Sequence, residues 1–349
     1  MKQNFPVTPD PNAGKKLSII FSFRNEEDVL EELITRVRNV LKSEQDKETL
    51  SGYELIFVND KSDDRSEDTL KAMDENYGDI KIINMSKTFG VSPCVMAGLK
   101  YATGDLAIYM DSDLQDPPEL ISKMLEAWDQ GENVDVVHTV RTSRAGEPFL
   151  KLQLTKLGYW VLGKLSDINL TAEAGDFKLL SRRVINHLNQ LNEYNPFMRG
   201  LVVWVGFNQT NIYYKREQRF AGDTKFPIIS RKVISNFFNS ALISFSSVPL
   251  QLASLIGLGG IIISVGMILF VFLVKFFGIT PPGRAAIMTA IMFMGSLQLL
   301  AFGVLGLYIH SVFIMIRKRP NFIVESIFGF TDLELKILRE VHKSDIQIF

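Results

Sequence analysis

The stretch Asp105-Leu-Ala-Ile-Tyr-Met-Asp-Ser-Asp-Leu-Gln-Asp-Pro-Pro-Glu119 indicates both the fold class and the chemistry of this chain. Its apolar part, Leu106–Met110, is typical of a strand buried in a parallel sheet. Asp111 and Asp113 follow it, and alternation along an extended chain points both carboxylates one way and Ser112 the other. The Pro-Pro pair suits the start of a helix. Two carboxylates at the end of such a strand predict a site for a divalent cation and the phosphate that it binds.

Apolar runs and helical patterns alternate on both sides of this stretch. Strands are expected at residues 17–23, 53–59, 80–84, 106–110, 134–139, 176–180 and 208–214, and helices at 28–41, 68–75 and 147–165. Ser181 is expected to open one further helix, and Trp204 lies in an apolar run that predicts a core position. This alternation predicts an α/β fold with a doubly wound, mostly parallel sheet.

Composition excludes some classes of function. The 349 residues carry a net charge of −1, so no basic field favours nucleic acid as a partner. Cys94 is the sole cysteine, which excludes an intramolecular disulfide and fits a reducing compartment. His138, His187 and His310 lack the spacing of metal ligands, so structural positions are expected for them.

Two long segments of the C-terminal part contain no Asp, Glu, Lys or Arg: residues 233–274 and residues 285–309. Each is longer than the roughly 20 apolar residues that cross a bilayer. They predict two transmembrane helices, at 250–277 and 285–316. The Phe- and Ser-rich segment before the first helix suits a helix at the membrane surface, although it lacks the usual basic face.

The basic residues around these helices predict their orientation. Arg231 and Lys232 precede the first helix, and Arg317–Arg319 follow the second, whereas the loop between the helices has basic residues only at its margins. The positive-inside rule therefore places both termini in the cytoplasm. The polar N-terminus has no apolar core of the signal-peptide type, which also predicts a cytoplasmic first domain. We expect a multi-pass protein of the inner, or plasma, membrane.

These patterns divide the chain into five parts. They are a polar N-terminal segment (1–16), a cytoplasmic catalytic domain (17–229), an interfacial amphipathic segment (230–247), a hairpin of two transmembrane helices (248–316) and a cytoplasmic tail (317–349) that has room for a short helix.

Four loops at strand ends carry the polar residues that suit catalysis. They are Ser22–Glu27, Val58–Asp64, Asp111–Gln115 and Gly175–Leu180. Carboxylates in the first two loops suit hydrogen bonds from a base and a ribose, and the third suits a metal on a diphosphate. Asp176, in the fourth, has no evident metal role and is available as a general base.

Taken together, these residues resemble glycosyltransferase family 2, and in particular its polyprenyl-phosphate branch. The resemblance covers roughly residues 17–325. It is carried by Asp111-Ser-Asp-Leu-Gln-Asp-Pro-Pro-Glu119, Asp176-Phe-Lys-Leu-Leu180, Arg199-Gly200, Arg219-Phe-Ala-Gly-Asp-Thr-Lys225, Ser244-Phe-Ser-Ser-Val-Pro-Leu250 and Arg317-Lys-Arg-Pro320.

The resemblance implies a GT-A-type domain and inverting, metal-dependent transfer of a hexose, glucose favoured, from a nucleotide-diphosphate sugar to a polyprenyl phosphate. The implied cofactor is Mg²⁺ or Mn²⁺, UDP is favoured over GDP, and membrane lipid and a second copy of the chain are further expected partners. The residues implied to bind the nucleotide are Ser22, Arg24, Glu26, Asp60 and Ser112, and those implied to bind the metal are Asp111, Asp113 and Gln115. Catalysis is implied for Asp176 with Asp111 and Asp113. Phosphate or acceptor binding is implied for Arg141, Arg144, Arg219 and Lys225.

Some alternatives stay open at this point. The first two loops depart from the family pattern at Ser22, Arg24 and Lys61, which leaves the nucleotide and sugar undecided. An acceptor phosphate is already anionic, so Asp176 acts either as a base or by positioning. The basic residues before the first membrane helix also suit anionic lipid. The competing functions are a processive polysaccharide synthase and a non-catalytic membrane scaffold that binds sugar nucleotides.

Overall fold

A computed structural model of the chain describes residues 14–131, 133–142, 174–191, 193, 196–215, 248–277, 283–317 and 319–341. The described residues up to 215 and those from 320 onward form one compact α/β unit. Two long helices, α9 and α10, belong to a second unit. The predicted helix at 147–165 and the predicted interfacial segment at 230–247 lie outside the described residues.

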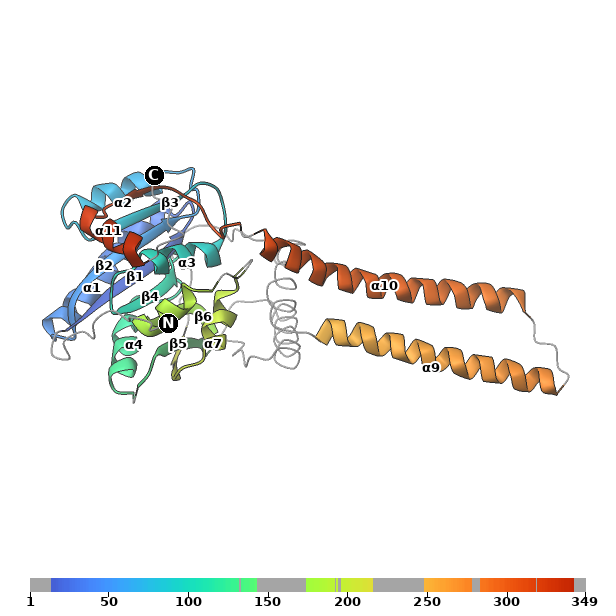
Figure 1. The fold of residues 1–349 in the computed structure, drawn as a ribbon. Helices are drawn as coiled ribbons and strands as arrows, with labels where there is room; N and C mark the ends of the chain where they lie inside the picture. The colour runs from blue at the N-terminus through green and yellow to red at the C-terminus, as the bar shows by residue number, and fades with distance from the viewer. Residues whose placement is uncertain are drawn as a thin grey trace. The chain divides into compact units, whose positions relative to one another are not determined.

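An eight-stranded sheet organises the α/β unit, in the order β7-β5-β6-β4-β1-β2-β3-β8 (Figure 1). The strands are β1 (Lys15–Phe23), β2 (Leu50–Asn59), β3 (Ile80–Met85), β4 (Leu106–Asp111), β5 (Val136–Arg141), β6 (Ala174–Ser181), β7 (Gln209–Tyr214) and β8 (Val324–Phe328). The seven strands expected from the sequence are all present, which confirms the α/β fold class.

Strand directions make the sheet mixed. β1 runs parallel to β2 and β4, β2 to β3, and β5 to β7. In contrast, β6 runs antiparallel to β4 and β5, and β8 runs antiparallel to β3. β1 to β4 therefore all end at one edge, called here the carboxyl edge, whereas β6 begins there. The opposite edge is called the amino edge.

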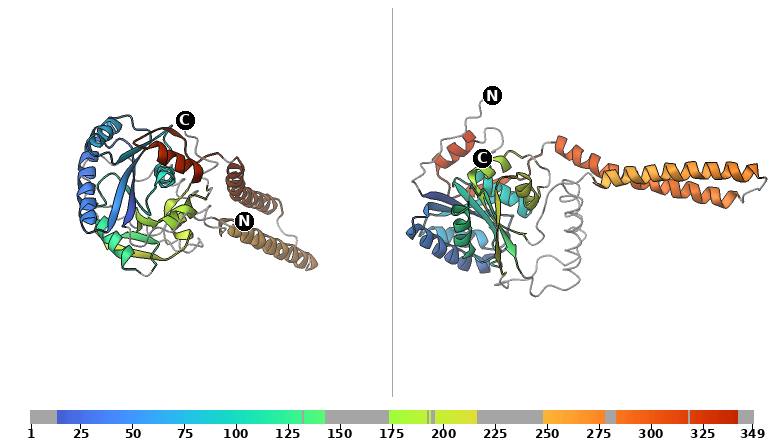
Figure 2. Two further views of the ribbon diagram at one scale, coloured as in Figure 1. Left: turned by 60° about the vertical axis from the view of Figure 1, so that its left-hand side comes forward. Right: turned by 90° about the horizontal axis from the view of Figure 1, so that it is seen from below.

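Helices cover both faces of the sheet (Figures 1 and 2). On β1, Ile19 and Phe21 share one buried cluster with Leu30 and Leu33 of α1. Ile20 faces the other side, where a Cβ added at Gly98 of α3 would overlap its side chain, so glycine permits the close approach of that helix. The helices of the unit are α1 (Glu27–Asp46), α2 (Ser66–Asp74), α3 (Val91–Tyr101), α4 (Leu120–Asp129), α6 (Arg182–Leu188), α7 (Met198–Trp204) and α11 (Asp332–Val341).

Local sequence explains how these helices begin and which faces they bury. In α1, apolar residues three and four positions apart form the buried stripe, and two acidic residues in the first turn complement the helix dipole. Ser181 caps α6 by accepting a hydrogen bond from the Val184 N–H, as the sequence predicts. The core position predicted for Trp204 is wrong: its side chain is 56% exposed, because α7 is short and ends at this residue.

The C-terminal tail belongs to this unit and contains more structure than the predicted short helix. β8 extends the sheet beyond β3, and α11 follows it. Phe330 packs edge-on against Tyr101 of α3. The sequence boundary drawn at residue 317 is therefore not the end of the α/β domain in space.

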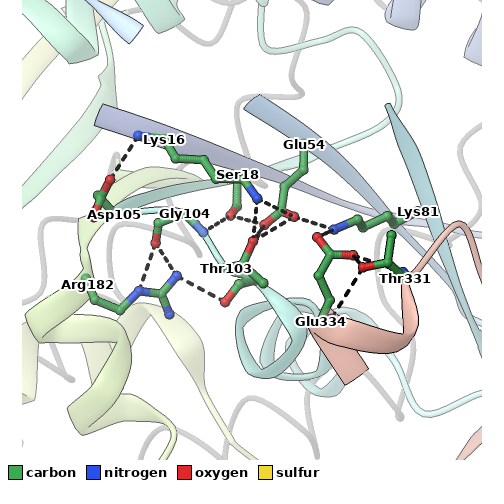
Figure 3. A network of polar contacts seen from close by, with 11 residues as sticks. Lys16, Ser18, Glu54, Lys81, Thr103, Gly104, Asp105, Arg182, Thr331 and Glu334 are labelled. Atoms are coloured by element: carbon green, nitrogen blue, oxygen red, sulfur yellow. Dashed lines mark hydrogen bonds and ion pairs between the residues drawn. The ribbon is translucent and has the colours of Figure 1, made fainter. Parts of the chain in front are cut away.

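A polar network at the amino edge joins the tail to three strands and the start of a fourth (Figure 3). The buried Glu54 carboxylate accepts hydrogen bonds from the Ser18 hydroxyl at 2.5 Å and from the Thr103 N–H at 2.7 Å. Lys81 Nζ lies 2.7 Å from Glu54 and 2.5 Å from Glu334 of α11. Burial would raise the pKa of Glu54, but Lys81 and these donors lower it to about 2.

α9 (Val248–Phe276) and α10 (Arg284–Ile316) form at the positions expected for the two membrane helices. Within the described residues, one span meets the length and hydropathy expected of a membrane helix: Ala290–Ile316, with a mean hydropathy of 2.2. Leu255–Met267 of α9 is a shorter apolar stretch. The two helices contact each other.

Candidate active site

The predicted site residues converge at the carboxyl edge because the strands that carry them end or begin there. The parallel register places Ser22 beside Asp111, and Phe23 beside Asn59. The antiparallel register pairs Tyr109 with Lys178, and two residues further along it Asp176 reaches the position beside Asp111. The first, third and fourth loops thus meet, and the second loop lies next to the first.

The loop after β4 is shaped by its own polar groups. The Gln115 N–H donates to the Asp113 carboxylate at 3.2 Å, and Leu114 takes a left-handed conformation with φ of 55°. The buried Ser112 hydroxyl donates to the Ser22 carbonyl at 3.1 Å and so joins this loop to the end of β1. The hydroxyl of Ser112 thus links the two loops, and its role in binding nucleotide stays a prediction.

Asp176 is held by Arg199, an arginine that the sequence indicates only through the Arg199-Gly200 motif. Arg199, in the first turn of α7, donates from Nε to Oδ1 at 2.8 Å and from Nη2 to Oδ2 at 2.5 Å. Burial alone would raise the pKa of Asp176, but Arg199, with Lys178 and Arg141, holds that pKa below its ordinary value. A carboxylate paired on both oxygens is a weak base and is fixed in direction.

Asp111 has the opposite electrostatic environment. Burial, and then repulsion from Asp176, Asp113 and Asp116, raise the pKa of Asp111 to about 8, with Arg199 acting against them. The site therefore gathers more negative charge than its arginines offset. A divalent cation between Asp111 and Asp113 would remove this repulsion, so the residues present fit the metal that the resemblance implies. No group of three or more His, Cys, Asp or Glu side chains in the described part of the chain forms a complete metal centre.

Asp116, which the sequence did not single out, connects the same loop to β5 and β7 through hydrogen bonds of its buried side chain. It is 1% exposed and accepts hydrogen bonds from Arg141 Nη2, at 3.0 Å to one oxygen, and from the Tyr214 hydroxyl. Arg141 Nε also donates to the Tyr214 hydroxyl at 3.0 Å. The predicted phosphate-binding guanidinium of Arg141 is thus paired within the protein, and it joins the ends of β5 and β7 to the Asp111 loop. The only sequence signal for Asp116 was its place inside the motif.

Three buried side chains with polar groups, Tyr109, Lys178 and His138, lie side by side across the sheet next to the site. Lys178 is 1% exposed and is the register partner of Tyr109 on one side and His138 on the other. Burial lowers the pKa of Lys178 to about 7, while Asp176 acts in the opposite direction. His138 Nε2 pairs with Gln209 at 2.7 Å, and burial lowers the pKa of His138 to about 4, consistent with the structural position expected for it.

Hydrogen bonds join the first loop, Ser22–Glu27, to the second loop, Val58–Asp64. Asn25 donates to Asp63 at 2.5 Å and accepts from the Asp63 N–H at 3.0 Å. Asp60 accepts from the N–H groups of Phe89 and Gly90, at 2.6 and 3.0 Å. Asp60 therefore shapes the loop after β3, and its predicted contact with the nucleoside stays a prediction.

The remaining predicted site residues lie in the first loop or outside the described residues. Arg24 is exposed and Glu26 half-buried, both in the loop after β1. The Ser22 hydroxyl is buried without a hydrogen-bond partner among the described residues. Arg144, Arg219 and Lys225 lie outside the described residues. Their predicted roles are untested.

Similar proteins show the family to which the chain belongs. The family model described as Glycosyl transferase family 2 matches residues 18–188. The chain belongs to this family and is a glycosyltransferase. An uncharacterized glycosyltransferase of Synechocystis sp. is 38% identical over 93% of this chain and 99% of its own length. The prophage bactoprenol glucosyl transferase homolog of Escherichia coli is 32% identical over 89% of this chain and 99% of its own length.

Among solved structures, glucosyl-3-phosphoglycerate synthase from Mycobacterium tuberculosis, in complex with Mn²⁺, UDP and phosphoglyceric acid, is similar. It has a TM-score of 0.43 and 20% identity, over 65% of this chain and 78% of that chain.

Proposed function

We propose that this protein transfers a hexose, with glucose favoured, from a nucleotide-diphosphate sugar, with UDP favoured, to a membrane polyprenyl phosphate. The observation that carries the proposal is the meeting of Asp111 and Asp113 with Asp176 at the carboxyl edge. The bactoprenol glucosyl transferase names of relatives that match almost the whole chain support the acceptor and the sugar.

Asp111, Asp113 and Gln115 are the residues that would hold Mg²⁺ or Mn²⁺. When bound, such an ion offsets the charge that develops on the leaving diphosphate. The excess negative charge around Asp111 supports this assignment, because a cation would relieve it. Arg144, Arg219 and Lys225 are proposed to supply further positive charge for the phosphates.

A direct displacement accounts for inversion at the sugar. An oxygen of the acceptor phosphate attacks the anomeric carbon, and the bond from that carbon to the diphosphate breaks on the opposite face. The attacking oxygen is already anionic at neutral pH, so no proton has to be removed. The pairing of Asp176 with Arg199 favours positioning over base catalysis for this carboxylate. Arg199 and Asp176 together form a polar pair that can orient the acceptor phosphate.

Membrane attachment is part of the proposal. β8 pairs with β3, so the chain returns to the catalytic domain after α10. If α10 crosses the bilayer, this return requires an even number of crossings, which favours α9 as the second membrane helix. The distribution of basic residues then favours a cytoplasmic catalytic domain. Arg144, Arg219 and Lys225, with Arg141, are proposed phosphate ligands, and Arg219 and Lys225 are assigned to the acceptor.

Transfer assays with the purified full-length protein test this function. UDP- and GDP-linked hexoses are each combined with undecaprenyl phosphate, with Mn²⁺ or EDTA, and the lipid phase is analysed by mass. One hexose per lipid, only with the metal, is expected. A polymer would support the processive synthase, and no transfer from any donor would support the scaffold.

A further inference from the structure

The tail enters the α/β unit beside the loop assigned to the donor nucleoside. The Ser86 N–H donates to the Ile323 carbonyl at 3.0 Å, and Val324 is the register partner of Met85. β8 therefore starts at the carboxyl edge, where β2 ends and Asp60 lies, and it runs toward the amino edge.

The first side-chain link between tail and loop is an ion pair. Glu325 of β8 lies 2.6 Å from Nζ of Lys61. Lys61 has a φ of 60°, a left-handed conformation that is unfavourable for a residue with a Cβ. Lys61 directly follows Asp60, so this ion pair joins the tail to the loop next to a residue assigned to the nucleoside.

The second link is a buried chain of amides. Asn84 Nδ2 donates to the Ser326 hydroxyl at 3.0 Å, and Asn84 Oδ1 accepts from Asn59 Nδ2 at 3.0 Å. Asn59 Oδ1 in turn accepts from the Ser62 N–H at 2.8 Å. Asn59 and Asn84 are 5% and 8% exposed, so the chain is shielded from water and its hydrogen bonds are costly to leave unmade.

We propose that β8 positions the loop Asn59–Asp64 through Glu325 and Ser326, so that the tail after the membrane helices sets the affinity for the nucleoside diphosphate. The inference rests on the proposed function and deepens it. A loop that is already ordered loses less conformational entropy when it closes on a base and ribose, which strengthens binding without any new contact to the ligand. Glu325 and Ser326 are positioning residues that act through Lys61 and Asn84.

Nucleotide titration of the full-length double variant Glu325→Gln/Ser326→Ala tests the proposal. With Mn²⁺ present, UDP should bind about five- to tenfold more weakly, the effect of losing one exposed ion pair and one hydrogen bond. The KM for polyprenyl phosphate should stay unchanged. Backbone pairing of β8 with β3 is retained, so the fold should persist.

Two matched variants separate positioning from general stability. Glu334→Gln removes a contact at the other end of the same tail, where Glu334 pairs with Lys81. It should lower Tm and leave the UDP Kd within about twofold, since the contact lies at the far edge of the sheet. Lys61→Gly removes both the ion pair and the unfavourable φ, so Glu325→Gln should have no effect on UDP binding in that background.

Hydrogen exchange supplies a readout that needs no ligand. In the double variant the amide of Ser62 should exchange faster than in the wild type. Unchanged exchange, an unchanged UDP Kd, or an equal loss of affinity in Glu334→Gln would each overturn the role of β8. A wild-type protein that binds neither UDP nor GDP would overturn the proposed function itself, and the role of β8 with it.

Discussion

Asp111 and Glu54 are acidic residues on strands of the same sheet, at opposite edges, and their pKa values are shifted in opposite directions. At the amino edge, Lys81 and hydrogen-bond donors lower the pKa of Glu54 to about 2 despite its burial. At the carboxyl edge, burial and three neighbouring carboxylates raise the pKa of Asp111 to about 8. Both residues are at least half-buried, so exposure alone does not account for the difference.

The two edges differ in whether polar groups of the protein satisfy the buried carboxylate, and the edge where they do not is that of the proposed metal site. Around Glu54, polar groups within the protein satisfy the charge (Figure 3). Around Asp111 they do not, although Arg199 and Arg141 neutralise two of its neighbours, Asp176 and Asp116. A protein that accumulates repulsion at one point lowers its own stability there, and a bound cation is the simplest source of compensation.

The largest expected effect comes from removing a carboxylate of the proposed metal pair. Asp111→Asn or Asp113→Asn should lower turnover about 10³-fold or more, because the leaving diphosphate loses its electrostatic stabilisation. The pKa of Asp111 is higher in the folded than in the unfolded protein, so the ionised group opposes folding at neutral pH. Asp111→Asn should therefore retain or raise Tm in EDTA. Wild-type-like turnover of either variant, after demetallation and return of Mg²⁺, would remove the metal assignment.

The second effect concerns Asp176 and its arginine. Asp176→Asn should lower kcat about 10²- to 10⁴-fold while the donor Kd changes little, because the residue is assigned to the reacting centre and not to the nucleotide. Stopped-flow or calorimetric titration of UDP, alongside the steady-state rate, separates the two parameters. Parallel loss of donor affinity would instead identify Asp176 as a nucleotide ligand or a structural residue.

The third effect tests the amino edge. Glu54→Gln should lower the free energy of unfolding by about 3 kcal/mol at pH 7 and leave kcat intact. The pKa of Glu54 is lower in the folded protein, so its contribution is complete above the unfolded value of about 4.5 and is lost as pH falls toward 2. The difference in Tm between wild type and variant should accordingly shrink across this range. A difference that is independent of pH would contradict the assigned role.

The smallest effect concerns Glu119, which belongs to the decisive motif in sequence but not to the site in space. It forms an exposed bidentate ion pair with Arg36 of α1, at 2.9 and 2.7 Å. Glu119→Gln should cost less than about 1 kcal/mol and leave the transfer rate unchanged. A large loss of rate in the transfer assay would mean that the carboxyl-edge site extends further than the residues described here.

The strands and helices of the catalytic domain were predictable because their signals are local. Val324–Phe328 was not predicted for a physical reason: as an edge strand in which no residue is fully buried, it gains its stability from backbone pairing with β3, which requires few apolar side chains. Trp204 was misassigned because an apolar run does not reveal where a short helix ends.

The candidate site likewise combines features that the sequence predicts with features that only the tertiary structure shows. By itself, the sequence predicted a chemical role for Asp111, Asp113 and Asp176, because carboxylates at the ends of buried strands stand out from their apolar neighbours. Only the tertiary structure decided that β6 runs antiparallel, which brings Asp176 beside Asp111. It also decided that Arg199 pairs with Asp176, whereas burial and three neighbouring carboxylates raise the pKa of Asp111. Strand direction and charge pairing are set by contacts between residues far apart in the chain, and no local pattern encodes them.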